Sequence, residues 1–212
     1  MAKVVTMGEI MLRLSTPNFE KFIQADEFDV CYGGGEANVA VSLSNYGHDA
    51  EFVTAVPDNE IGECATAALN KYGVSTKNVA KCGERLGIYY LESGCSMRPS
   101  KVVYDRAHSS ISTATAADFD FDKIFEGADW FHFTGITPAV SDMAAELTEA
   151  ALKAAKAKGC SVKVETRGSG GAKNVLTERE IAEADCAALR ISGDDSDCHH
   201  PVRLFGKRVR GG

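Results

Sequence analysis

Apolar residues in the first quarter of the chain occur in short runs typical of strands. The run at residues 3–15 is interrupted by a glycine-glutamate pair at positions 8 and 9, and positions 10–15 then alternate apolar with polar. Alternation of this kind predicts a strand with one covered face. Residues 28–32 predict a second short strand, and residues 52–56 predict a buried strand that ends at a Pro-Asp-Asn turn.

Three segments show helical spacing of their apolar residues: 36–46, 61–72 and 143–158. Each is followed by a glycine, a residue that commonly ends helices. Strands and helices therefore alternate along the chain. That order predicts an α/β fold with a largely parallel sheet.

The middle of the chain has a different pattern. Residues 88–91 and 101–104 flank a segment rich in turn-forming residues, which predicts a β-hairpin. Residues 129–135 predict another core strand that runs into a glycine turn.

The pattern changes after about residue 162. Residues 165–171 are polar and rich in glycine, and residues 177–184 predict a short helix that begins with a Thr177–Glu180 capping box. Residues 192–212 have almost no apolar periodicity, and we expect them to be poorly ordered.

Composition narrows the class of protein. The chain has 212 residues and a net charge of -7, and 44% of its residues are hydrophobic. An acidic chain is a poor binder of nucleic acid, which requires a basic surface. Its seven cysteines are irregularly spaced and contain no CxxC motif, which predicts reduced thiols in a cytoplasmic protein without a structural metal. No segment is long and apolar enough to span a membrane.

The glycine run at positions 33–35 is the most informative local motif. Glycines allow a ligand to approach the main chain, and the helix that follows offers free N–H groups. Asn38, one turn into this helix, can donate to and accept from a pair of sugar hydroxyls. An ordinary turn that begins a helix explains the same residues equally well.

Aromatic residues and an arginine in the predicted hairpin form a second candidate site. Alternate residues of a strand share a face, so Tyr104 and Arg106 point the same way, while Asp105 points to the other face and leaves Arg106 free for a ligand. Tyr89 lies on the other strand. Phenol rings stack on sugars, and a guanidinium binds a carboxylate with two hydrogen bonds. A half-exposed strand with ordinary aromatics is the alternative.

Other polar residues carry weaker expectations. We expect His132, inside an apolar run, to be a hydrogen-bonded core residue, and Arg167 to lie in a solvated loop. His199 and His200 stand near Cys198 and three aspartates, but clusters of this kind are usually solvated, so we assign no metal ligand.

Five segments in order resemble the PfkB (ribokinase-type) carbohydrate kinases: VVTMGEIMLRLS, GGGEANVAVSLSNYG, FVTAVPDNEIG, YDRAHSSIS and DWFHFTGI. Within that family the resemblance is greatest to 2-keto-3-deoxygluconate kinase, and it covers about residues 1–162. It implies a truncated ribokinase-like three-layer α/β sandwich with a small β-sheet lid. It also implies transfer of a phosphate from ATP, with Mg²⁺, to a sugar acid, and a homo-oligomer that forms through the lid.

The resemblance assigns substrate-binding roles residue by residue. Gly33, Gly34 and Asn38 would hold sugar hydroxyls, and Tyr89, Tyr104 and Arg106 would contact the sugar from the lid, with Arg106 near its carboxylate. Gly8 and Glu9 stand where the first strand of the family meets the pocket. The family's Gly-Ala/Gly-Gly-Asp motif, which supplies the catalytic base, has no counterpart in this sequence, so no catalytic residue is assigned.

Residues 163–212 resemble a different family. The segment VKVETRGSGGAKNVLTEREIAEAD and the later LFGKRV look like part of a phosphotransferase-system fructose-type enzyme IIB domain. That family carries phosphate on a cysteine whose strand and loop have no counterpart here. Three classes therefore compete: a sugar kinase, a sugar-binding module without catalysis, and a phosphocarrier fragment. For these 212 residues we expect sugar binding without catalysis.

Overall fold

The computed structural model describes residues 1–159, 162–168, 171–173 and 186–191, and it describes side chains for residues 1–159 only. Its core is a parallel three-stranded sheet in the order β4 (Asp49–Val53), β1 (Lys3–Met7), β9 (Trp130–His132). Alternate residues of these strands face opposite sides, so both faces of the sheet are apolar and both must be covered.

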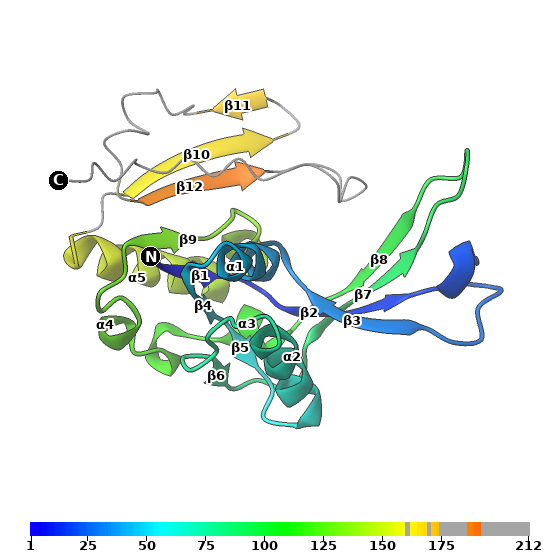
Figure 1. The fold of residues 1–212 in the computed structure, drawn as a ribbon, viewed down its shortest axis with the longest axis horizontal. Coiled ribbons are helices and arrows are strands. Elements are labelled where there is room, and N and C mark those ends of the chain that lie inside the picture. Colours follow the sequence, from blue (N-terminus) through cyan, green and yellow to red (C-terminus); the bar gives the residue numbers. More distant parts are fainter. Residues whose placement is uncertain (160–161, 169–170, 174–185, 192–212) are drawn as a thin grey trace.

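Helices cover the two faces of this sheet. On one face α1 (Gly35–Asn45) and α2 (Glu60–Asn70) pack over Phe52, and on the other α5 (Asp142–Ala157) packs over Val5 and Met7. The short helices α3 (Ser110–Thr113) and α4 (Phe121–Ile124) join the α5 side. The predicted three-layer α/β arrangement is confirmed (Figure 1).

Side-chain caps fix where α2 and α5 begin. The Oδ1 atom of Asn59 accepts hydrogen bonds from the amides of Ile61 and Gly62, both at 3.1 Å. The Ser141 hydroxyl accepts one from the Ala144 amide at 3.0 Å. These bonds satisfy N–H groups that have no partner within the helix.

A four-stranded lid projects from the core (Figure 1). Its order is β3 (Asp29–Gly33), β2 (Met11–Ser15), β7 (Gly87–Glu92), β8 (Lys101–Asp105). The pairs β2–β3 and β7–β8 are antiparallel, and β2 and β7 are parallel. The predicted hairpin is therefore confirmed, as part of the lid.

The remaining elements are short or lie late in the chain. The pair β5 (Ala55–Val56) and β6 (Ala80–Lys81) extends the core, and single 3-10 turns occur at η1 (Pro17–Phe19), η2 (Ala116–Asp118) and η3 (Thr137–Ala139). A second sheet has the order β11 (Gly171–Lys173), β10 (Val162–Gly168), β12 (Cys186–Ile191), and β12 lies beside β9 (Figure 1).

Several expectations need correction. The predicted strand at residues 129–135 ends at His132, because the amide of Thr134 donates to the Glu36 side chain at 3.1 Å instead of to a neighbouring strand. The polar segment after residue 162 begins with strand β10, and Arg167 lies in this strand, not in a loop. The predicted helix at residues 177–184 and the whole of the segment expected to be poorly ordered, residues 192–212, lie outside the described residues.

A carboxylate holds the far end of the lid together. Glu92, at the end of β7, is 2% exposed; it accepts a hydrogen bond from the amide of Phe22 at 3.0 Å and forms an ion pair with Arg98. Arg98 also donates to the carbonyl oxygen of Phe19. The Phe22 amide, followed by the positive charges of Lys101 and Arg98, lowers the pKa of Glu92 below its ordinary value.

We predict that acid loosens the tip of the lid. Because the folded protein lowers the pKa of Glu92, the stabilisation is complete above the ordinary value of 4.5 and is lost as the pH falls through the lowered value. An NMR titration of the Phe22 amide should show its transition below pH 4.5. Glu92→Gln should remove this transition, and the same transition in that variant would contradict the assignment.

Candidate functional site

All four lid strands meet the core around one residue, Glu9. It stands between β1 and β2, β3 runs past it into Gly34, β7 begins beside it at Gly87, and β8 returns through Arg106. The chain therefore crosses between core and lid four times at one place. Any ligand under the lid at this end would lie close to Glu9.

The Glu9 carboxylate is buried and bound to the lid. Its residue is 5% exposed, and Oε2 pairs with Nη2 of Arg106. Its second oxygen, Oε1, has no hydrogen-bond partner, and neither has Nε of Arg106, although both atoms are buried. The expectation that Arg106 is free was therefore wrong: Glu9, which is far away in sequence, neutralises it.

The three glycines at positions 33–35 differ in the space that each leaves for a side chain. A Cβ atom on Gly34 would lie 2.0 Å from the Glu9 carbonyl oxygen, whereas on Gly33 it would lie 3.5 Å from Oδ1 of Asn38, and on Gly35 it would meet nothing within 4 Å. Gly34 is thus required because two segments that cross between lid and core touch here. The glycine run predicted close approach of a ligand, but at Gly34 the neighbour that excludes a side chain is the Glu9 backbone.

A second buried carboxylate, Glu36, joins the start of α1 to the segment after β9. Its Oε1 accepts hydrogen bonds from the Thr134 hydroxyl at 2.6 Å, the Thr134 amide at 3.1 Å and the Thr137 hydroxyl at 3.1 Å. A Cβ atom on Gly8 would lie 2.3 Å from its Oε2. Sequence reasoning missed Glu36, and the only signal was an acidic residue among apolar ones at a helix start.

His132 lies close to this carboxylate. Burial lowers the pKa of its imidazole, and the charge of Glu36 opposes that shift. Its Nε2 is buried without a hydrogen-bond partner, so His132 is a core residue but not the fully hydrogen-bonded one that was expected.

The predicted lid residues come together on one face. Tyr89 and Tyr104 are cross-strand partners with ring centroids 5.9 Å apart, and the guanidinium of Arg106 lies 5.7 Å from the centre of the Tyr104 ring. Asp105 points to the opposite face, as expected, where it pairs with Arg85 at 2.9 Å. Tyr89, Tyr104 and Arg106 therefore lie together on one face of the lid, at the end nearest Glu9.

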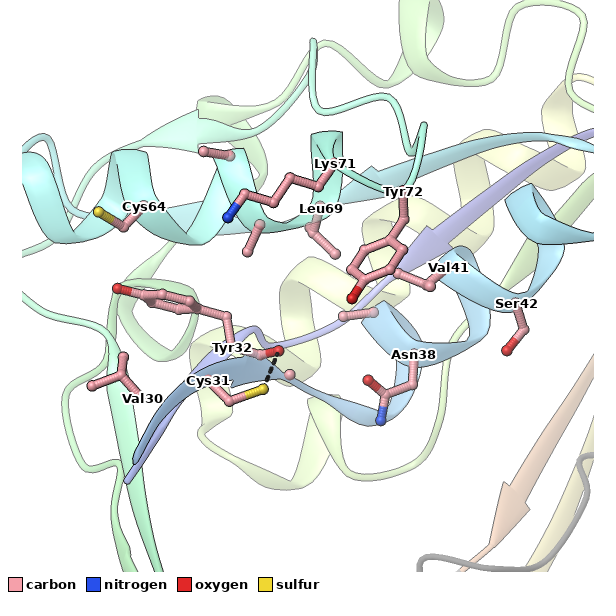
Figure 2. Close-up of a pocket in the computed structure, with 14 residues that line it drawn as sticks. Val30, Cys31, Tyr32, Asn38, Val41, Ser42, Cys64, Leu69, Lys71 and Tyr72 are labelled. Carbon is pink, nitrogen blue, oxygen red and sulfur yellow. Dashed lines mark hydrogen bonds between the residues drawn. The ribbon is translucent and has the colours of Figure 1, made fainter. Parts of the chain in front are cut away.

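A cavity of about 700 Å³ lies between β3, α1 and α2. Gly33 and Asn38 line it together with Cys31, Lys71 and Tyr72, and Figure 2 shows Lys71 and Tyr72 on the opposite side from Cys31 and Asn38. Tyr89, Tyr104 and Arg106 do not line this cavity. The structure thus places the six predicted residues in two groups, with Gly34 buried at the crossing between them.

Metal-binding clusters and membrane-spanning helices can be assessed in the part of the chain that the structure describes. There, no group of three or more His, Cys, Asp or Glu side chains is placed to hold a metal ion, and no helix has the length and apolar character needed to cross a membrane. His199 and His200 lie outside the described residues.

Comparison with known proteins identifies the family. The model of the pfkB family carbohydrate kinases matches residues 1–186. The chain belongs to this family. The match runs past residue 162, where the sequence pattern changes.

Two relatives within the PfkB family are similar to this chain, one in its solved structure and one in its sequence. The crystal structure of 2-dehydro-3-deoxygluconokinase from Thermotoga maritima superposes with a TM-score of 0.76 at 49% identity, over 87% of this chain and 56% of that one. The 2-dehydro-3-deoxygalactonokinase of Haloferax volcanii is 37% identical over 74% of this chain and 49% of its own length. The chain therefore spans about half the length of these PfkB relatives.

One relative lies outside the PfkB family. The PTS system fructose-like EIIB component 2 of Escherichia coli is 55% identical over 67 residues, which are 32% of this chain and 58% of that protein. The second resemblance expected from the sequence is thereby confirmed. The boundary between the PfkB-like segment and the EIIB-like segment was expected at residues 162–163, and this position stays a prediction.

We predict opposite effects for alanine at two adjacent glycines. Gly34→Ala should destabilise the protein by roughly 1–3 kcal/mol, because the new methyl group would overlap the Glu9 carbonyl. Gly35→Ala should be neutral or stabilising by up to about 1 kcal/mol, because Gly35 begins α1 and has open space around it. Urea unfolding of both variants measures the difference; equal effects would show that the crossing does not constrain Gly34.

Proposed function

We propose that this chain is the sugar-binding half of a kinase for 2-keto-3-deoxy sugar acids. The observation that carries the proposal is the Tyr89–Tyr104–Arg106 face, which meets the core at the glycine run. Tyrosine rings and a guanidinium suit a ligand with hydroxyl groups and one carboxylate. The two relatives that act on 2-dehydro-3-deoxy sugar acids support this substrate class.

Each residue has a role in this proposal. Asn38 and the backbone at Gly33 and Gly34 hold sugar hydroxyls at the start of α1, where free N–H groups favour oxygen ligands. Tyr89 and Tyr104 cover the sugar from the lid. Arg106 faces its carboxylate end, in an orientation that Glu9 fixes through their ion pair.

The family uses ATP, and the residues of the sugar side do not fit Mg²⁺–ATP. A magnesium ion requires free carboxylate oxygens and near-octahedral geometry. Glu9 is ion-paired with Arg106, Thr134 and Thr137 donate to Oε1 of Glu36, and within the described residues no cluster of His, Cys, Asp or Glu is placed to hold a metal ion. We therefore derive no phosphate-transfer step from these residues, and we propose binding without catalysis for the 212-residue polypeptide.

We predict that these 212 residues bind 2-keto-3-deoxygluconate but do not phosphorylate it. Isothermal titration calorimetry should detect binding, and an assay for ADP release should detect no turnover. Loss of a general base alone lowers a rate by about 10²–10⁴-fold. Turnover proportional to the amount of protein would overturn the proposed lack of catalysis, and absence of any binding would overturn the proposed sugar site.

We also propose that two copies pair through the other face of the lid. Val30, Leu14, Tyr90 and Val103 form a continuous row across all four strands on the face opposite Tyr89 and Tyr104. Val30 is 63% exposed and Val103 is 52% exposed. An apolar row on a sheet face favours burial against a similar surface, and a second copy supplies the same row.

If two copies pair through this row, a charged residue within it should lower the mass of the particle in solution from that of a dimer to that of a monomer. Val103→Glu should convert a dimer into a monomer in sedimentation velocity, because it places a charge in the apolar contact. Met143→Glu is the matched control, because it places the same charge on an exposed apolar residue of α5, outside the lid, and it should leave the dimer intact. A monomer already present in the unchanged protein would overturn the pairing.

A further inference from the structure

The inner face of the lid carries a second arginine. Arg13 lies in β2, in register with Cys31 of β3 on one side and Tyr89 of β7 on the other. Tyr89 is in turn the partner of Tyr104 in β8. Residues paired across a sheet share a face, so Cys31, Arg13, Tyr89 and Tyr104 form one row on one side of the lid.

That side is the one that faces Glu9 and Arg106. A Cβ atom on Gly87 would lie 2.5 Å from Oε1 of Glu9 and 3.1 Å from Cβ of Arg106, so the Gly87 position faces both side chains. Tyr89 is two residues further along β7 and shares that face. Arg13, beside Tyr89, therefore lies on the face that we assign to the sugar.

The two arginines differ in electrostatic state. Arg106 is paired with Glu9, so its charge is cancelled at close range. Arg13 forms no ion pair with a carboxylate in the described part of the chain, and its Nε is buried without a hydrogen-bond partner. Buried donors are normally satisfied, so a guanidinium donor that no described residue satisfies, beside two tyrosines, is well placed for an acceptor on a ligand.

We propose that Arg13 determines specificity for an acidic sugar by binding the substrate carboxylate. The inference rests on the proposed sugar site and adds the group that selects the acid over a neutral sugar. Standard strand spacings place the backbone of Arg13 roughly 12 Å from that of Arg106. The two long side chains then approach a ligand between them from two directions, and Arg13 brings the uncancelled positive charge.

The test compares two sugars that differ only at one carbon. The 212-residue chain is titrated by calorimetry with 2-keto-3-deoxygluconate and with 3-deoxyfructose, which has a hydroxymethyl group in place of the carboxylate. Arg13→Gln should weaken binding of the acid roughly 10–100-fold and of the neutral sugar by less than about 3-fold. Arg13→Lys should recover part of the loss, because lysine keeps the charge without the planar fork.

The control variant is Lys101→Gln, which removes a lid cation from the opposite face. Its side chain lies in register with Glu92 and not with the row of Arg13. It should leave the preference for the acid unchanged.

Three other outcomes decide against the proposal. Equal losses for both sugars in Arg13→Gln would mean that Arg13 supports the lid, and unchanged binding would mean that it touches neither sugar. Either result would overturn the role of Arg13 and leave the proposed sugar site standing. Failure of the unchanged chain to bind either sugar would overturn the sugar site and this inference together.

Discussion

The ion pair between Glu9 and Arg106 is the contact on which the candidate functional site depends. It joins the segment that leaves the core for the lid to the segment that returns from it, across 97 positions of sequence. Both groups are largely removed from water, where loss of one partner leaves an uncompensated charge and destabilises strongly. The lid is thus fixed to the core electrostatically, at the place that we propose for the sugar.

The glycines around this pair follow from the same constraint. Gly34 and Gly87 each stand where a side chain would overlap Glu9, and Gly8 stands where one would overlap Glu36. Each carboxylate therefore has a glycine that makes space for it. A motif that suggests ligand approach is here explained by contacts of the chain with itself, and the two explanations predict different effects for substitutions at neighbouring glycines.

The lid has two faces with different chemistry because its strands alternate strictly. One face presents Arg13, Tyr89, Tyr104 and Arg106, and the other presents the apolar row that includes Val30 and Val103. Tyr104 on the first face is 42% exposed, and Val30 and Val103 on the second are 63% and 52% exposed. The proposed sugar ligand and the proposed second copy would supply one partner each.

The sequence by itself determined the α/β class, the lid hairpin, the helix that follows the glycine run and the family, because local periodicity and ordered motifs are properties of contiguous residues. It could not determine that Glu9 neutralises Arg106, that Glu36 ends β9 early, or that Arg13 lies beside Tyr89. Strand alternation gave the direction of Arg106 relative to Tyr104, but not its partner. These contacts join residues far apart in the chain, and only the packing of lid against core brings them within bonding distance.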